Sequence, residues 1–216
     1  MITEKYEDVL RFWFPSQPSP DQAAMVCQWE WWFRGGGNVE IIEHFSPLLE
    51  QAIRGELDDW SHQPRSRLAL ILVLDQFSRS IYPDTAQASA QDSKACKLVL
   101  EGIHVGHYEA IKTPWEKTFF FLPLGHSEDL RNLELAIKFA DDIVQEAPQE
   151  YRALLEFSAA QARRHQDILT QFGRHPHRNK ALGRQSTLEE LEYLASGQLV
   201  HKRSMPSHLS QFLSET

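Results

Sequence analysis

Cysteine is scarce in this chain of 216 residues, which has two, Cys27 and Cys96, and no Cys-x-x-Cys spacing. A disulfide framework and a zinc ribbon are therefore excluded, and we expect both thiols to be reduced. Long apolar runs are missing as well. The longest, residues 68–74, falls far short of the roughly 18 residues that are needed to cross a bilayer. The sequence therefore predicts no membrane partner.

Basic residues are too few to outweigh the acidic ones. Lys and Arg number 22 against 30 Asp and Glu, which gives a formal net charge of −8. A general nucleic-acid binder needs a surplus of cations to displace counterions, so we expect no nucleic-acid partner. The N-terminus has neither a basic start nor an apolar stretch. Because no secretory signal is recognised there, we expect a cytoplasmic protein.

Apolar residues recur at helical spacing along most of the chain, and strand signals are nearly absent. Capping boxes with proline at the first helical position predict helix starts at Ser19-Pro20 and Thr113-Pro114. Ser127 is expected to cap a later helix, and Ser186 and Thr187, each with a glutamate three residues on, offer two overlapping capping boxes for the last one. The run 68–74 has the pattern of either a buried strand or a buried helix. Its alanine and leucine content, and the lack of a partner strand, favour a helix.

Prolines and glycines divide this helical pattern into segments. Pro47 is expected to kink or split one helix, and the aromatic helix that starts after Thr113 is expected to end at Pro123. A helix from Thr85 is expected to reach Gly102, and Gly173 suits a left-handed C-cap after a long apolar stripe. We therefore predict one all-α domain of antiparallel helical hairpins over residues 1–197, followed by a polar tail over 198–216.

Two polar side chains interrupt apolar faces. Asp75 lies four residues after Ile71 on the same helical face, where a carboxylate is costly unless it is paired, and Arg79 lies one turn further on. Asp75 is therefore half of a structural ion pair, a general base, or a carboxylate that orients a ligand. His165 lies on the long stripe of the helix before Gly173, either as a core residue or as a neutral base or ligand.

The loop after Gly173 combines positive charge with a helix start. It contains four cationic residues, Arg174, Arg178, Lys180 and Arg184. Between Asp167 and Glu189 the sequence has no acidic residue, so the local field is positive. With the N–H groups of the helix that begins near Thr187, these side chains form a candidate anion seat. The alternative is that they tie the loop to acidic helices and to helix C-terminal carbonyls.

Other chemistry has weaker support in the sequence. His126, Glu128, His165 and His177 have the side-chain types that bind zinc or iron, but none of them belongs to a His-Glu-x-x-His or Glu-x-x-His spacing. We therefore predict no metal and no cofactor. Ser127 is not expected to be a nucleophile, because the Gly-x-Ser-x-Gly elbow is also missing.

Four segments form motifs that can be compared with known families. They are Phe12-Trp13-Phe14, residues 74–79, His126-Ser127-Glu128, and residues 165–187. Together they resemble the bacterial domain of unknown function 924 family. The resemblance implies an all-helical, tetratricopeptide-like arrangement and names no reaction. It supports a candidate site without roles, made of Asp75, Arg79, His126, Glu128, His165, Arg174, His177, Arg178, Asn179 and Arg184. Family members commonly have an aromatic residue where His175 stands, so His175 is left out.

These residues lead to three functional hypotheses. The first is that the polar segments converge on a pocket that binds a small anionic molecule. The second is an enzyme in which Asp75 or His165 acts as general base while arginines stabilise negative charge on the substrate. The third is a helical scaffold whose groove binds a peptide or protein partner.

Overall fold

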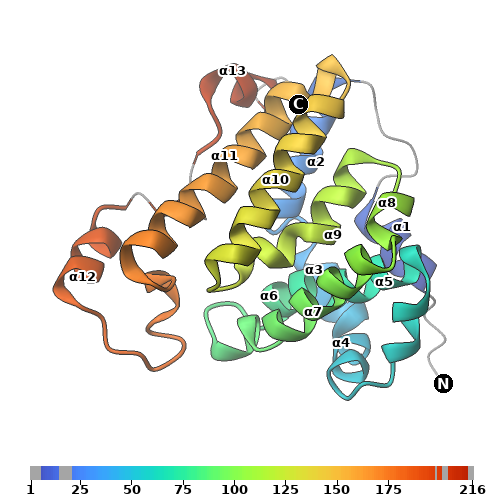
Figure 1. Ribbon diagram of the computed structural model, residues 1–216, viewed down its shortest axis with the longest axis horizontal. Coiled ribbons are helices and arrows are strands. Elements are labelled where there is room, and N and C mark those ends of the chain that lie inside the picture. Colours follow the sequence, from blue (N-terminus) through green and yellow to red (C-terminus); the bar gives the residue numbers. More distant parts are fainter. Residues whose placement is uncertain (1–5, 15–20, 198, 201–203, 214–216) are drawn as a thin grey trace.

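The computed structural model describes residues 6–14, 21–197, 199–200 and 204–213, and these consist of helices and connecting turns without a strand among them (Figure 1). The predicted all-α fold class is confirmed. It includes the ambiguous run 68–74, which is helical throughout. No helix of the described ranges has both the length and the apolar character that a membrane span needs.

The N-terminal half surrounds the most deeply buried segment. Helix α5 (Pro64–Leu72) continues into a π-helical turn, η3 (Val73–Phe77), and residues 68–74 are fully buried. Apolar side chains on every side of α5 require neighbours all around it. These neighbours and their connections are α1 (Tyr6–Trp13), α2 (Gln22–Phe33), α3 (Asn38–Glu40), η1 (Ile41–Phe45), α4 (Ser46–Ile53), η2 (Asp58–His62), α6 (Ser78–Ile81), η4 (Ala86–Ser89), α7 (Asp92–His104) and α8 (His107–Ala110).

Three longer helices form the second half of the body. They are α9 (Pro114–His126), α10 (Leu130–Glu146) and α11 (Gln149–Phe172). Short loops join them, so consecutive helices are antiparallel, and α10 packs against both α9 and α11. Figure 1 shows α10 and α11 side by side across the centre. These stacked hairpins fit a tetratricopeptide-like arrangement.

The end of α11 leads into a smaller lobe. Gly173 ends the helix with φ 68°, as predicted for a left-handed C-cap. The chain then passes through the short turn η5 (Pro176–Arg178) to α12 (Leu188–Ala195), which projects from the body in Figure 1. Thr187 and Glu190 form the predicted capping box at its start.

Several predicted helix boundaries are corrected by the structure. Helix α9 does not end at Pro123 but continues to His126, because the surrounding phenylalanines and Leu124 are buried and their packing outweighs the lost backbone hydrogen bond. Asp129, not Ser127, caps α10, and its carboxylate accepts from the Arg131 N–H. The predicted break at Pro47 is present: the π-helical turn η1 ends at Phe45, and α4 begins at Ser46 with Pro47 in its first turn.

Two more helix starts differ from expectation. The segment after Thr85 forms the 3-10 turn η4 and then breaks, so that α7 begins at Asp92 and continues past Gly102. Asp21 caps α2 and accepts from the Ala23 N–H, whereas the expected start at Ser19-Pro20 lies outside the described residues.

The stretch expected to be a polar tail also contains packed residues. Leu209 in α13 (Ser207–Ser210) is fully buried, and Met205 is nearly so. The last turn, η7 (Gln211–Leu213), contacts α2. Apolar side chains at these positions therefore join the core of the body.

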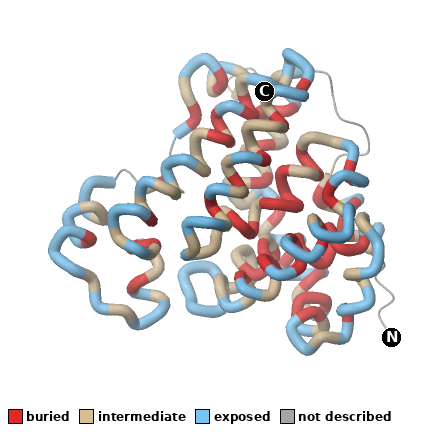
Figure 2. The backbone as a smooth tube through the Cα atoms, in the orientation of Figure 1, coloured by how far each residue is buried: buried red, intermediate tan, exposed pale blue. Residues whose placement is uncertain are grey.

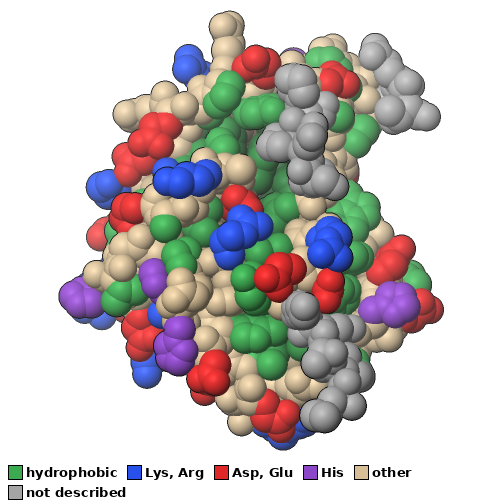
Figure 3. Space-filling model, turned by 90° about the vertical axis from the view of Figure 1, so that its right-hand side faces the viewer, with side chains coloured by type: hydrophobic (Ala, Val, Ile, Leu, Met, Phe, Trp, Pro, Cys, Tyr) green, Lys and Arg blue, Asp and Glu red, His purple; other side chains and the backbone are tan. Residues whose placement is uncertain are grey.

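The face in Figure 3 combines exposed hydrophobic groups with side chains of both charges. Positive and negative groups are interspersed there, and neither sign dominates the view. Among the described side chains on this face, cations form no broad surface of the kind that attracts a phosphate backbone.

Candidate functional site

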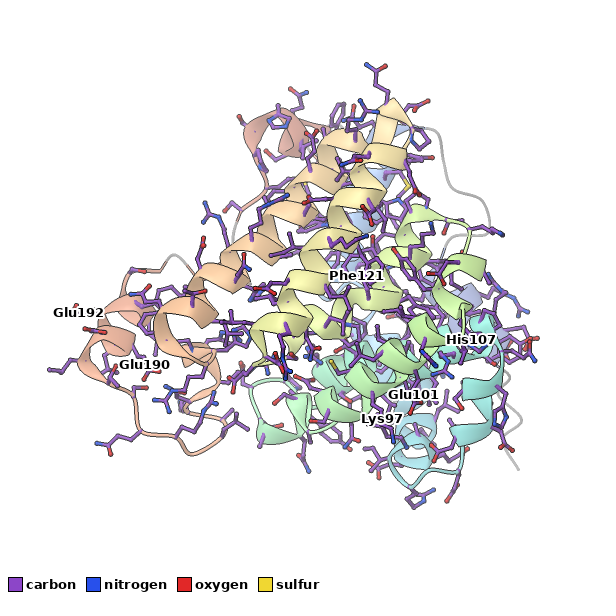
Figure 4. The ribbon with its side chains drawn as sticks, viewed as in Figure 1. Lys97, Glu101, His107, Phe121, Glu190 and Glu192 are labelled. Atoms are coloured by element: carbon purple, nitrogen blue, oxygen red, sulfur yellow. The ribbon has the colours of Figure 1, made fainter. Side chains whose placement is uncertain are left out.

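A cavity of about 510 Å³ lies among α2, α6, α9, α10, α11 and the loop after α11. Part of its wall is aromatic and aliphatic, and Phe121, which Figure 4 labels near the centre of the molecule, belongs to that part. The rest of the wall is polar. Five predicted site residues line it: Arg79, His126, His165, His177 and Arg178.

Asp75 lies directly behind this polar wall. It sits in the π-helical turn η3, a local distortion that often marks functional positions, and it is 1% exposed. Its Oδ1 is 2.8 Å from His126 Nδ1 and 3.2 Å from Arg79 Nη1, and its Oδ2 accepts from the Gln76 amide at 2.5 Å. Burial opposes ionisation of Asp75, but the charge of Arg79 and the hydrogen bond to His126 outweigh it and lower the pKa of Asp75.

Arg79 and Arg178 share a second carboxylate. Asp92 Oδ1 accepts from Arg79 Nη2 at 2.9 Å, and Asp92 Oδ2 lies 3.0 Å from Arg178 Nη1. Burial disfavours the charge on Arg79, but Asp75 and Asp92 more than compensate and raise its pKa. For Arg178 the balance is reversed: burial and nearby Arg79 lower its pKa despite Asp92. The positive charge of Arg178 is therefore the less well compensated of the two.

The contact with Asp75 determines which ring nitrogen of neutral His126 carries the proton. An ionised carboxylate accepts a hydrogen bond, so Nδ1 carries the proton of the neutral ring. Nε2 then keeps its lone pair, and His126 is part of the cavity wall. The arrangement can orient His126 to accept a proton or a hydrogen bond from a molecule in the cavity.

Arg174 and Asn179, which were also predicted as site residues, serve the α12 lobe instead. Arg174 binds Glu190 with Nε at 2.6 Å and Nη2 at 2.8 Å, and the Asn179 amide donates to the same carboxylate at 3.1 Å. The hydrogen bond from Arg174 lowers the pKa of Glu190 to about 2, although burial acts in the opposite direction. In Figure 4, Glu190 lies on the inner side of the lobe and Glu192 on its outer side.

The N–H groups at the start of α12, which were expected to help bind an anion, already have a carboxylate. The Thr187 N–H donates to Glu190 Oε2 at 2.8 Å, and the Glu190 N–H donates to the Thr187 hydroxyl. Glu190 thus occupies the position that a bound anion would take. We call Arg174, Asn179, Thr187 and Glu190 the lobe staple.

Glu128 and Arg184 fasten the loop after α11 to the start of α10. Their bidentate pair has distances of 2.8 and 3.0 Å, and the His175 N–H donates to Glu128 Oε1 at 2.8 Å. Burial raises the pKa of Glu128, but Arg184 and the His175 backbone reverse the effect and lower it. Neither Glu128 nor Arg184 belongs to the cavity wall. The pair therefore holds the loop against α10 outside the cavity wall.

His175 is buried between His165 of α11 and His177 of the loop. Its ring meets His165 edge to face at 5.3 Å and lies 5.6 Å from His177 between centroids. Within the described part of the chain neither ring nitrogen makes a hydrogen bond of normal geometry, and the backbone of Ser127 attracts the ring only weakly. Burial, followed by the nearby charge of Arg178, lowers the pKa of His175 to about 4. The ring therefore behaves as a neutral aromatic at this position.

Sequence reasoning missed several residues of this region. Asp92 carried no signal, because its partners Arg79 and Arg178 are far apart in the chain. Trp29 and Trp32 of α2 are buried, and they also line the cavity. Across the ranges that the structure describes, no three His, Cys, Asp or Glu side chains are arranged to hold a metal ion.

Together, fold and site define an all-helical protein with a partly polar, partly aromatic cavity. Residues 9–198 match the model of a family described as bacterial protein of unknown function, DUF924. A solved structure of a protein of unknown function from Agrobacterium tumefaciens is similar at 33% identity and a TM-score of 0.65, covering 89% of this chain and 97% of that chain. No curated protein matches significantly. The chain therefore belongs to the DUF924 family.

Proposed function

We propose that this protein binds a small anionic molecule in the cavity, with Arg178 as its main charged contact. The observation that carries the proposal is the sharing of carboxylates in the polar wall. The Asp92 carboxylate contacts both Arg79 and Arg178, and the Asp75 carboxylate contacts both Arg79 and His126. A guanidinium has five N–H donors, so Arg178 keeps donors for a bound anion.

Burial strengthens such an interaction. The Arg178 side chain is 16% exposed, and charge-assisted hydrogen bonds are stronger where water is largely excluded. Trp13 and Gln161 of the cavity wall also have buried polar atoms, Nε1 and Oε1, without hydrogen-bond partners among the described residues. Buried polar atoms are normally paired, so these two atoms are further contacts for a ligand or for ordered water.

Isothermal titration with inorganic phosphate, acetate and dicarboxylates tests the proposal. We expect at least one of these anions to bind, and Arg178→Gln to weaken its binding by about 1.5 to 3 kcal/mol, the usual scale for a hydrogen bond to a charged group. Arg164→Gln is the matched control, since Arg164 is exposed on α11 and is not part of the cavity wall. Equal losses in both variants, or none in either, would contradict the proposal.

An enzyme is the second candidate function, favoured by the 2.8 Å contact between Asp75 and His126. Asp75 itself does not belong to the cavity wall, so it would be the positioning residue and His126 would accept the proton. In this function the arginines would stabilise negative charge that develops on the substrate.

Esters of the acids that bind are suitable probes for this second function. General-base catalysis typically contributes about 10² to 10⁴ in rate, so His126→Gln should lose turnover on that scale. Acid binding should meanwhile stay within a few-fold of the unmutated protein. If the unmutated protein cleaves none of these esters, this second function is not supported.

A further inference from the structure

The cavity is elongated, and two parallel helices set its long axis. Leu155, Ala159, Ala162 and His165 lie on successive turns of α11, and all four line the cavity. At about 1.5 Å per residue, the distance along the helix from Leu155 to His165 is about 15 Å. Helix α9 runs in the same direction as α11, because α10 is antiparallel to both.

The chemistry changes along this axis. The last lining residues of α9 and α11 are His126 and His165, whereas their earlier turns contribute Phe121 and Leu155. Helix α10 runs the opposite way and brings Ile143 to the apolar end. Trp29 and Phe33 of α2 extend the apolar wall, and the Trp29 indole N–H donates to the Ser158 hydroxyl at 3.1 Å. One end therefore combines His126, His165 and Arg178, while the other is mainly aromatic and aliphatic, with Thr118 and with Arg34 over the Trp29 ring as its polar groups.

Small side chains keep the middle of the cavity open. Gly125 on α9, Ala136 and Ala140 on α10, and Ala159 and Ala162 on α11 all line it. A methyl group added at Gly125 would meet no atom within 4 Å. Larger aliphatic residues at these positions would fill the space between the two ends. The residues that face the cavity therefore leave room for an apolar body, not for a head group alone.

From these walls we infer that the ligand is an amphipathic acid, with its anionic head at Arg178 and an alkyl or aryl body along α11. This inference rests on the proposed anion binding and specifies its ligand class. A largely apolar cavity with a few convergent polar groups is typical of small-molecule sites, and a volume of about 510 Å³ is in their range.

A series of straight-chain acids tests the inference on the unmutated protein. Acetate, butanoate, hexanoate and octanoate share one head group and differ in their apolar bodies. Trp13, Trp29 and Trp32 line the cavity, so intrinsic fluorescence reports occupancy. Each buried methylene should tighten binding about fourfold. Octan-1-ol serves as the uncharged analogue of octanoate.

Two leucine variants locate the apolar body. Ala162→Leu adds bulk between the polar and apolar ends, whereas Ala160→Leu makes the same change on α11 outside the cavity wall. Ala162→Leu should remove most of the gain from acetate to octanoate, and Ala160→Leu should leave it intact. If Ala162→Leu fails to fold, the chain-length series on the unmutated protein still decides the question.

The outcomes distinguish failure of the amphipathic-ligand inference from failure of the anion-binding proposal. If all four acids bind equally and all weaken in Arg178→Gln, the amphipathic ligand is overturned and anion binding stands. If octan-1-ol binds as tightly as octanoate and Arg178→Gln affects neither, the anionic head is overturned. If none of the four acids binds, the amphipathic ligand is overturned, whereas anion binding falls only if phosphate and the dicarboxylates also fail to bind.

Discussion

The loop after α11 contains two kinds of arginine, although all of them looked alike in the sequence. Arg174 and Arg184 each form a bidentate pair with a carboxylate, Glu190 and Glu128 respectively. Arg178 has Asp92, which it shares with Arg79. The first kind has its charge matched within the protein, and the second retains donors for another anion. Pairing, not loop position, therefore separates structural arginines from candidate binding residues.

The lobe around α12 and the body of the molecule also differ in how far their residues are buried. Figure 2 shows the lobe around α12 mostly exposed, with a few buried positions, whereas the body contains many buried positions. In the lobe, Leu188 and Leu191 face solvent while Glu190 is buried. An ion pair thus takes the central place that an apolar residue usually holds in a small helical unit. The body has an apolar core, so it does not depend on an ion pair at its centre.

The largest effect is expected at Asp75, which underlies the polar wall. Asp75→Ala leaves Arg79 and His126 without their shared carboxylate and should destabilise the fold by about 3 to 5 kcal/mol. Urea denaturation measures this. Asp58→Ala is the contrast, because its 2.8 Å pair with Lys94 is largely exposed and should be worth about 1 kcal/mol or less. Similar midpoints for Asp75→Ala and the unmutated protein would contradict the buried pairing.

The second effect is a dependence of stability on pH that arises from His175. Its pKa of about 4 lies below the ordinary value of 6.5. Between these two pH values His175 is therefore protonated in the unfolded chain and neutral in the folded protein. Stability is thus complete above pH 6.5 and falls as the pH drops towards 4. At about 1.4 kcal/mol per pH unit, this group costs about 2 kcal/mol between pH 6.5 and pH 5.

His175→Phe tests this assignment. A phenylalanine keeps the aromatic contacts with His165 and His177, and it removes two buried nitrogens that lack hydrogen bonds of normal geometry. Denaturation at pH 7.5, 6.5, 5.5 and 5 should show a smaller acid loss in the variant. Burial also lowers the pKa of His107, but that residue is present in both proteins. Parallel curves for the two proteins would show that His175 is not the source.

Much of the helical framework could be predicted because its signals are local. Thr113 and Thr187 cap helices through residues three positions away, and Gly173 ends α11 by its own backbone conformation. Pro123 shows where local reasoning fails, since burial of its neighbours outweighs the intrinsic cost of proline. Asp129 took the capping role expected of Ser127, because both are good caps two residues apart.

The site was harder to predict because its pairings span distant parts of the chain. Asp75 meets His126 across 51 positions, whereas sequence spacing offered Arg79 alone as a partner. The apolar stripe of α11 did contain a usable signal. Ser158, Ala162 and His165 are small or polar at positions that would otherwise be filled by large apolar residues, and all three line the cavity. Such a change within a stripe indicates a helix face that borders a cavity.

The smallest expected effect sharpens the contrast between the two kinds of arginine. Arg174→Gln removes the cation from Glu190 in the lobe staple, whereas Arg178→Gln removes a cation of the cavity wall. Because Glu190 and the Gln185 carbonyl, which Arg174 contacts, lie outside the cavity wall, Arg174→Gln should change ligand affinity by less than about threefold. Its effect should appear in hydrogen exchange, with faster exchange of the α12 amides in this variant and not in Arg178→Gln. If Arg174→Gln instead weakens binding as much as Arg178→Gln, then lobe and cavity act as one unit. The division by pairing would then be wrong.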